Sequence, residues 1–343
     1  MTSTVTPTVV ASSTSPLSAT AVPSAFFSTE DYHRFHARAA TYDAENTFFT
    51  EDFEELRDAG YLRAALPPQY GGRGLSLSEV AREQRQLAYW APATALAVNM
   101  HLYWTGPAAA LTSSGAEDFS WLLGAVRDGE VFAAGHGERG NDVGLDDSVV
   151  TARPQPDGSY LIDGRKTFTS LGPVWTSVGI HARDDSDPAD PRIVWYLPLL
   201  ANVYFGIARR ALDVAILHAA TRSSLVPGID AHAAKPAVQR QIGEAEIQLD
   251  AAYALLETAT RDADAGVDLG VWTVPRLFSA KEFATRTAKN VVDIAVQVVG
   301  ASSVSRRNEL ERLYRDVRTG QLHPPNSDAT LDVIGRTSLG LLP

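Results

Sequence analysis

Apolar residues recur at intervals of three and four along most of the chain after Trp195. This spacing gathers apolar side chains on one face of an α-helix, and that face must be buried against other helices. The three longest rows cover residues 200–214, 238–256 and 277–298. With a shorter helix expected over 328–339, the pattern predicts a C-terminal four-helix bundle spanning residues 196–343.

A different period governs residues 130–195, where short apolar runs alternate with turn signals. The runs expected to form strands are residues 131–134, 149–152, 160–162, 178–182 and 193–195. Asp157-Gly158 lies between the second and third runs, and such a pair favours a tight turn that joins two antiparallel strands. We therefore expect residues 130–195 to form a small β domain.

The region before the β domain again predicts helices. Ser28 and Thr50 are suitable first residues for two of them, and Gly60 is a stop signal. Residues 66–75 are too rich in Pro and Gly for a helix or a strand and predict a shaped loop. Further helices are expected over about 76–90 and 93–111.

These patterns together predict an α+β fold that is mostly α. The expected units are a disordered tail over residues 1–27, which are rich in Ser, Thr, Ala and Pro, an N-terminal helical domain over 28–129, the β domain and the bundle.

Composition narrows the possible partners. The 343 residues carry a net charge of -11 and include no cysteine. Binding to nucleic acid or to an anionic membrane needs a basic face, which this balance does not favour. Without cysteine the chain has no disulfides or thiolate nucleophiles, and its histidines lack the spacing of a metal site. No apolar run reaches the roughly 20 residues that span a bilayer. We expect a cytoplasmic protein without metal.

Two charged or glycine-rich segments have more than one interpretation. Residues 135–140 match the G-x-G-x-x-G pattern, but turn-forming residues follow them where a dinucleotide-binding loop needs a helix. We therefore favour a loop whose backbone N–H groups approach a ligand. Residues 311–318 interleave three arginines with acids. They form either an ion-paired surface turn or an anion contact at a subunit boundary.

Several segments, in the right order, resemble the acyl-CoA dehydrogenase family of flavoproteins. The resemblance covers nearly everything from residue 28 onward. The segments that carry it are the Pro- and Gly-rich loop 66–75, Asp163-Gly164-Arg165-Lys166-Thr167-Phe168-Thr169-Ser170, Gln297-Val298-Val299-Gly300-Ala301 and the charged run 311–316. The resemblance implies FAD as cofactor, or alternatively FMN or reduced flavin, and a homodimer or homotetramer whose sites are shared between chains.

The resemblance also implies which residues contact the flavin. On the β domain these are Gly135, Gly140, Asn141, Phe168 and Ser170, with Phe168 standing for the family's tryptophan and Ser170 for its threonine. Arg222 and Ser224 are expected at a neighbour's flavin phosphates, Gln297 and Gly300 at its adenine side, and Asn326 as a further contact. The charge and fork shape of an arginine suit such an anion.

Two departures from the family affect the expected chemistry. The glutamate that removes a proton in the family's dehydrogenases is replaced by Pro324, and its alternative position holds Tyr196. His323 and Asp328 are the nearest substitutes as catalytic residues, and Glu138 is a third. The second departure is length: several dozen residues that the family has between Val194 and Leu197 are missing, so the β domain is shortened.

Three functions are consistent with this pattern. The first is an FAD-dependent oxidoreductase that oxidises a CH–CH bond of an acyl-CoA or similar thioester. The second is a monooxygenase that uses reduced flavin on the same fold and needs no glutamate, with His323 and Ser170 as hydrogen-bond donors. The third is a degenerate, non-catalytic family member. The retained flavin-contact residues favour an enzyme that acts on a small molecule.

Overall fold

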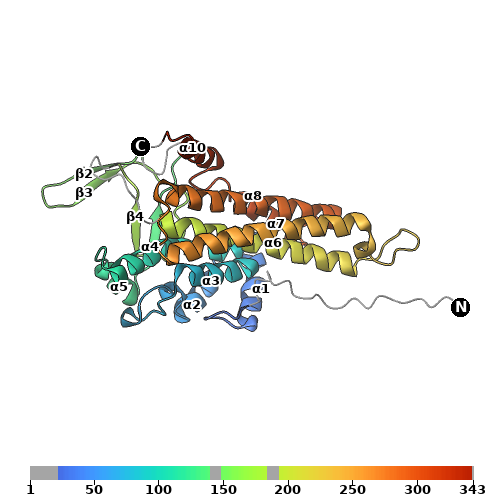
Figure 1. Ribbon diagram of the computed structural model, residues 1–343. Coiled ribbons are helices and arrows are strands. Elements are labelled where there is room, and N and C mark those ends of the chain that lie inside the picture. Colours follow the sequence, from blue (N-terminus) through green and yellow to red (C-terminus); the bar gives the residue numbers. More distant parts are fainter. Residues whose placement is uncertain (1–21, 140–147, 184–192, 342–343) are drawn as a thin grey trace.

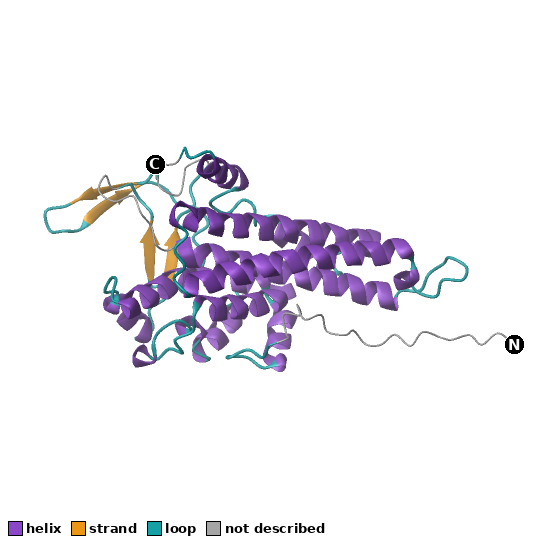
Figure 2. Ribbon diagram, viewed as in Figure 1, coloured by secondary structure: helices purple, strands orange, loops and turns teal. Residues whose placement is uncertain are grey.

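The computed structural model describes residues 22–139, 148–183 and 193–341. Helices dominate these ranges, and four short strands lie at one end of the molecule (Figures 1 and 2). The expected fold class, α+β and mostly α, is confirmed. None of the helices in the described ranges combines the length and the apolar character that crossing a bilayer requires.

The helices fall into two groups. Those before the strands are α1 (Thr29–Glu45), α2 (Thr50–Asp58), α3 (Leu77–Trp90), α4 (Pro92–Ser114) and α5 (Ser120–Arg127). Those after the strands are α6 (Ile193–Thr221), α7 (Pro236–Asp264), α8 (Thr273–Val299), α9 (Glu309–Val317) and α10 (Ser327–Ser338). Helices α6, α7 and α8 run side by side along the molecule (Figure 1).

The apolar rows of the long helices meet in a common core. Leu200, Ala252 and Val291, one from each of α6, α7 and α8, are fully buried. The predicted helical bundle is confirmed, although α3 also packs along α6, and α10 lies against α8 over the end of the bundle that carries the strands (Figure 1).

Local sequence signals explain where helices begin. Ser28 accepts a hydrogen bond from the backbone of Asp31, whose side chain accepts one from the backbone of Ser28, and Ser76 and Glu79 repeat this capping box at α3. Residues 66–75 between them form the expected loop, with a single 3₁₀ turn at Pro68–Tyr70. Gly72 is required there, because a Cβ on it would lie 2.1 Å from the carbonyl oxygen of Leu66.

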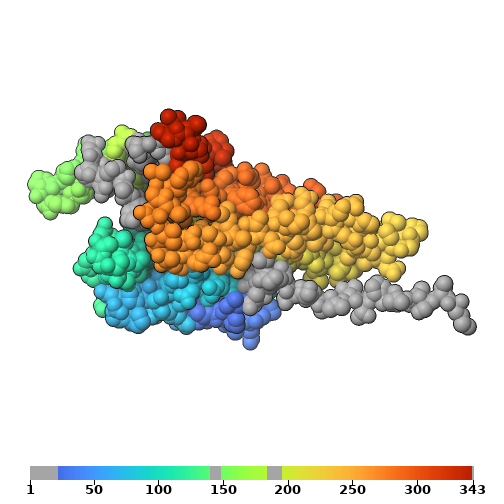
Figure 3. All heavy atoms as spheres, viewed as in Figure 1, coloured from blue at the N-terminus to red at the C-terminus, as the bar shows by residue number. Residues whose placement is uncertain are grey.

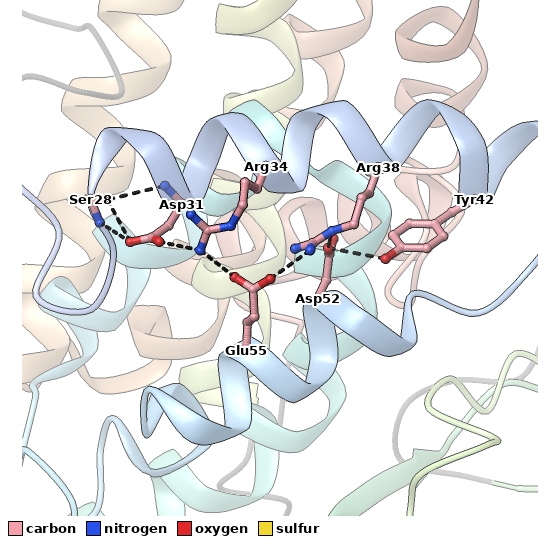
Figure 4. A network of polar contacts seen from close by, with 7 residues as sticks. All are labelled: Ser28, Asp31, Arg34, Arg38, Tyr42, Asp52 and Glu55. Carbon is pink, nitrogen blue, oxygen red and sulfur yellow. Dashed lines mark hydrogen bonds and ion pairs between the residues drawn. The ribbon is translucent and has the colours of Figure 1, made fainter.

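A polar network joins α1 to α2 (Figure 4). Arg38 donates to Asp52 at 2.6 Å and to Glu55 at 2.7 Å, and Arg34 reaches the other oxygen of Glu55 at 2.9 Å. Asp52 is fully buried and also accepts a hydrogen bond from Thr94 of α4. The network therefore fixes the position of these two N-terminal helices against α4.

Residues 24–27 correct the expected tail. The backbone N–H of Ala25 and the hydroxyl of Ser24 both donate to Glu83 of α3, and Phe27 is buried in the core. These residues are anchored because Phe27 supplies apolar surface that the N-terminal helices cover. The disordered tail that we expected over 1–27 is thus wrong for its last four residues, and residues 1–21 lie outside the described ranges.

The four strands form two separate pairs. Strand β1 (Phe132–Gly135) pairs in parallel with β4 (Ser177–Ile180), and β2 (Thr151–Pro154) pairs antiparallel with β3 (Tyr160–Asp163). The predicted hairpin is confirmed. All four residues of β3 are exposed, and the hairpin projects from the body of the molecule (Figure 3).

The strand expected over 193–195 is wrong, since α6 begins at Ile193. The β-branched and aromatic residues of this triplet favour a strand locally. The ring of Trp195, however, packs directly on Gly106 of α4, where an added Cβ would come within 2.1 Å of it. Burial of this ring therefore favours the helix over the local preference.

Candidate functional site

Two loops lie side by side at the strand end of the molecule. One follows β1 over residues 136–138 and the other follows β3 over residues 164–170. The backbone N–H of Thr167 donates to the carbonyl of Gly137 at 2.8 Å, and a Cβ on Gly137 would lie 2.6 Å from the carbonyl of Thr167. Within the described ranges, the buried hydroxyl of Thr167 has no hydrogen-bond partner. The two loops thus approach as closely as backbone allows.

A buried ion pair also ties these loops together. Lys166 Nζ lies 2.5 Å from Glu138, and both side chains are less than one-tenth exposed. Ser148 and the backbone N–H of Val149 donate to the same carboxylate. Burial raises the pKa of Glu138, but the hydrogen bonds and the charge of Lys166 outweigh it and lower the pKa to about 2. Glu138 is therefore a fixed anion and a poor candidate for the base.

Phe168 combines an exposed side chain with an unusual backbone conformation. Its side chain is 91% exposed, and its backbone has a φ of +57°, a value that residues other than glycine rarely adopt. A backbone in this region costs about 1–3 kcal/mol and persists where the surroundings enforce it. Leu171, with a φ of +69°, is buried close behind it, and Ser170 is half-buried. An exposed aromatic ring on this support can stack on a planar ligand.

A cluster of rings lies beside these loops. The imidazoles of His136 and His181 stack with their centroids 4.6 Å apart, and the hydroxyl of Tyr103 lies 3.4 Å from His136 Nδ1. The ring of Tyr196 meets Tyr103 edge to face. Burial raises the pKa of Tyr196 well above its usual value, so this phenol is no base at neutral pH. Sequence reasoning missed the cluster because its members come from α4, α6 and two separate loops.

The other expected catalytic residues lie near the start of α10: His323 is in the segment between α9 and α10, and Asp328 is in α10 itself. His323 is partly buried with its ring 5.8 Å from that of Tyr204, and burial together with the charge of Lys281 lowers the pKa of its imidazole to about 4. Asp328 is exposed in the first turn of α10. Asn326 caps that helix by accepting a hydrogen bond from the backbone of Ala329 at 2.9 Å.

The remaining residues that we expect to contact the flavin lie at the opposite end of the long helices. These residues are Arg222, Ser224, Gln297 and Gly300. Arg222 is exposed after the end of α6, and its guanidinium donates to the carbonyl of Val299 at 3.3 Å and lies 3.5 Å from His218 Nε2. No carboxylate of the described residues pairs with it, which leaves its charge available for an anion. Gly300, with a φ of +76°, ends α8 beside it.

One chain does not bring all the expected site residues together. Gly135, Phe168 and Ser170 lie on or next to the strands, and His323 and Asn326 lie between α9 and α10, whereas Arg222 follows the last residue of α6. The strands and the last turn of α6 are at opposite ends of the molecule (Figure 1). A helix of 29 residues is roughly 43 Å long, so the two groups are too far apart to share one ligand within a chain. Gly140 and Asn141 lie outside the described residues.

Other features of the described chain do not add to the site. The arginines of residues 311–318 are ion-paired within the chain, with Arg315 bonded to Asp43 and Glu311, so the ion-paired interpretation is the better one. No group of three or more His, Asp or Glu side chains in the described ranges could hold a metal ion. A cavity of about 300 Å³ lies between the 66–75 loop and Trp195.

Comparison with known proteins identifies relatives along most of the chain. Residues 31–119 match the family described as "Acyl-CoA dehydrogenase, N-terminal domain", and residues 199–327 match "Acyl-CoA dehydrogenase, C-terminal domain". The chain is 28% identical to the putative acyl-CoA dehydrogenase YdbM of Bacillus subtilis, over 87% of this chain and 91% of YdbM. It is 26% identical to a dibenzothiophene monooxygenase of Rhodococcus erythropolis, over 90% and 92%.

The fold has close counterparts among solved structures. A structure of KijD3 in complex with FMN and a dTDP-linked amino sugar superposes with a TM-score of 0.78 at 23% identity, over 92% of each chain. The alignment with YdbM extends over 358 positions, more than the 343 residues of this chain. The chain therefore lacks positions that its relative has, in agreement with the shortened β domain.

Proposed function

Because the chain belongs to the acyl-CoA dehydrogenase family, we propose that it is a flavin-dependent oxidoreductase, and specifically a monooxygenase that uses reduced flavin. In that reaction one atom of O₂ enters a small organic substrate, the other leaves as water, and reduced flavin supplies the two electrons. The dibenzothiophene monooxygenase among the relatives supports this choice.

The observation that carries the proposal is the state of the candidate bases. A dehydrogenase needs a proton acceptor with a pKa near the working pH. Among the described candidates, Glu138 is locked with a pKa of about 2, His323 has a pKa of about 4, Tyr196 is a buried phenol and Asp328 faces solvent. An imidazole that stays neutral is a hydrogen-bond donor and a weak base, which suits oxygenation better than proton abstraction.

The residues at the strand end fit a flavin ring. Phe168 offers an exposed aromatic face, Gly137 lets the backbone approach closely, and the hydroxyl of Thr167 is buried with no partner among the residues that the structure describes. With Gly135 and Ser170 these residues would hold the ring, while His323 would donate a hydrogen bond from the α9–α10 segment. KijD3 has been solved with FMN, so FMN is as suitable as FAD.

A complete site also needs a second copy of the chain. Arg222, Ser224, Gln297 and Gly300 lie too far from Phe168 to serve the same flavin within one chain. In a homodimer with two-fold symmetry, the far end of each bundle reaches the strand end of the other, and each interface residue occurs twice. Arg222 of one copy would then neutralise the phosphate of the flavin held by its partner.

One measurement without oxygen and one in air test the proposed function. We expect the purified protein to bind FMN or FAD, and we expect the oxidised flavin to keep its colour when butyryl-CoA or octanoyl-CoA is added without oxygen. With reduced FMN, air and dibenzothiophene or indole as probes, we expect an oxygenated product. Bleaching of the bound flavin by a thioester would contradict the proposal. A protein that ignores both flavins would contradict the wider assignment.

Acyl-CoA dehydrogenation remains the second candidate, because YdbM, a putative acyl-CoA dehydrogenase, is more similar in sequence than the monooxygenase reported above. It would require a base other than the four candidates considered above, or a rearrangement that raises the pKa of His323. The anaerobic titration with thioesters distinguishes the two.

A further inference from the structure

Lys281 is a buried cation that the proposed site does not use. It lies on α8 with no exposed surface. Burial lowers the pKa of its ammonium to about 8, against the charge of Glu282, so it is still mostly protonated at neutral pH. Taking such a group out of water is unfavourable unless its hydrogen bonds are replaced. Its partners therefore indicate what the charge is for.

Both of its hydrogen bonds go to one segment. Lys281 Nζ donates to the carbonyl of His323 at 3.0 Å and to the carbonyl of Pro325 at 2.9 Å. An ammonium offers three donors, and two of those of Lys281 are taken up by carbonyls of this segment, so the buried cation ties down two peptide planes. One of these planes is the peptide bond that follows His323, and the other is the peptide bond that follows Pro325. The first is therefore directly attached to the residue whose imidazole is of interest.

Glu282, the next residue of α8, binds side chains of the same segment. The carboxylate of Glu282, also buried, accepts a hydrogen bond from the hydroxyl of Ser327 at 2.9 Å and a longer one from Gln321 at 3.5 Å. Lys281 and Glu282 thus contact every second residue from 321 to 327. Hydrogen bonds to charged groups are stronger than those between neutral groups.

We propose that Lys281 is a positioning residue for His323: its ammonium, assisted by Glu282, fixes the backbone of residues 321–327 and so sets the position and the electrostatic surroundings of the imidazole of His323. A cation close to an imidazole opposes protonation of the ring. This role rests on the proposed function only where His323 is taken as the hydrogen-bond donor. The placement of the segment itself is independent of any flavin.

The test compares Lys281→Met with Lys289→Met, a change on the same helix at a lysine for which the structure shows no hydrogen bond or ion pair. His323 is followed by NMR of labelled histidine and assigned with His323→Gln. In Lys281→Met we expect the pKa of His323 to rise by about one unit and amide exchange over 320–328 to accelerate about tenfold, with the rest of the protein unchanged. Lys281→Arg should keep the lower pKa.

An unchanged pKa of His323 in a folded Lys281→Met protein overturns the proposal. So does an equal change in Lys289→Met, or faster exchange throughout the bundle, which would show a general structural role. These readings need neither flavin nor substrate, so they stand apart from the proposed function. If the oxygenase activity is found, Lys281→Met should lower kcat about tenfold and leave KM nearly unchanged.

Discussion

His101 is a fully buried histidine whose protonation state the hydrogen bonds define. The backbone N–H of Phe132 donates to Nδ1 at 3.0 Å, so Nε2 must carry the proton that is shared with the carbonyl of Leu62, also at 3.0 Å. The residue is thus the satisfied core histidine that its apolar surroundings in the sequence suggest. Burial lowers the pKa of His101 from 6.5 to about 4, partly opposed by the bond to Leu62.

This lowered pKa predicts a loss of stability in acid. Between pH 6.5 and about 4 the unfolded chain binds a proton at His101 that the folded chain does not, so the stability present above pH 6.5 falls as pH decreases. His101 should contribute about 3 kcal/mol to the decrease in the free energy of unfolding over this window, in addition to other groups such as His323, and urea denaturation measures the total. His101→Gln, which can make both hydrogen bonds, should reduce the pH dependence. His33→Gln, at an exposed position, should leave it unchanged, and equal slopes in both variants would contradict the assignment.

Phe168 gives a prediction about ligand binding. Because its ring is 91% exposed, Phe168→Ala should change the free energy of unfolding by no more than about 0.5 kcal/mol. If the ring stacks on flavin, the same change should weaken binding of FMN about two- to tenfold, measured by fluorescence quenching. The matched control is Tyr160→Ala, which removes a half-exposed ring from the hairpin. Equal affinities of Phe168→Ala and wild type would remove Phe168 from the site.

At the scale of elements, one ion pair holds the two loops of the site. Glu138→Gln leaves the buried ammonium of Lys166 without its carboxylate, which should destabilise this region by about 3–5 kcal/mol. The double variant Glu138→Gln/Lys166→Met should lose less than the two single variants together, because no unpaired charge remains. Hydrogen exchange of residues 135–138 and 166–170 measures the effect. Strict additivity would show that the pair does not act as a unit.

The sequence predicts elements well where the signal is local. The capping pairs of Ser28 and Ser76, the Asp157-Gly158 hairpin and the rows of the long helices all depend on residues within a few positions of one another. The strand that we predicted over residues 193–195 was wrong because the packing of Trp195 depends on Gly106, which is far away in the chain. Likewise nothing local indicates that Phe27 is buried.

The candidate site was harder to predict for the same reason. Glu138 looks like a free acid in the sequence, and only folding places Lys166 and Ser148 against it. The ring cluster of Tyr103, His136 and Tyr196 assembles from three distant segments. Family resemblance did identify Phe168 and Arg222 as residues worth testing, but it could not say that they lie at opposite ends of one molecule.

At the scale of the whole molecule, that separation allows a test of the shared site. If Phe168 and Arg222 of different copies complete one flavin site, variants Phe168→Asp and Arg222→Ala should each bind flavin poorly. When the two are unfolded, mixed in equal amounts and refolded, half of the dimers contain one of each chain. Each mixed dimer has one site with both wild-type residues, so about a quarter of all sites should recover wild-type affinity.

The control for this mixture is Arg240→Ala, which removes an exposed arginine from the same end of the bundle. Arg240→Ala alone should bind flavin normally if Arg222 acts through its position and not through the general charge of that end. Sedimentation of the mixture checks that mixed dimers form. A mixture that shows dimers but no recovery of binding would place Phe168 and Arg222 in separate sites. Two variants that each bind flavin as tightly as wild type would show that neither residue contacts it, whatever the assembly.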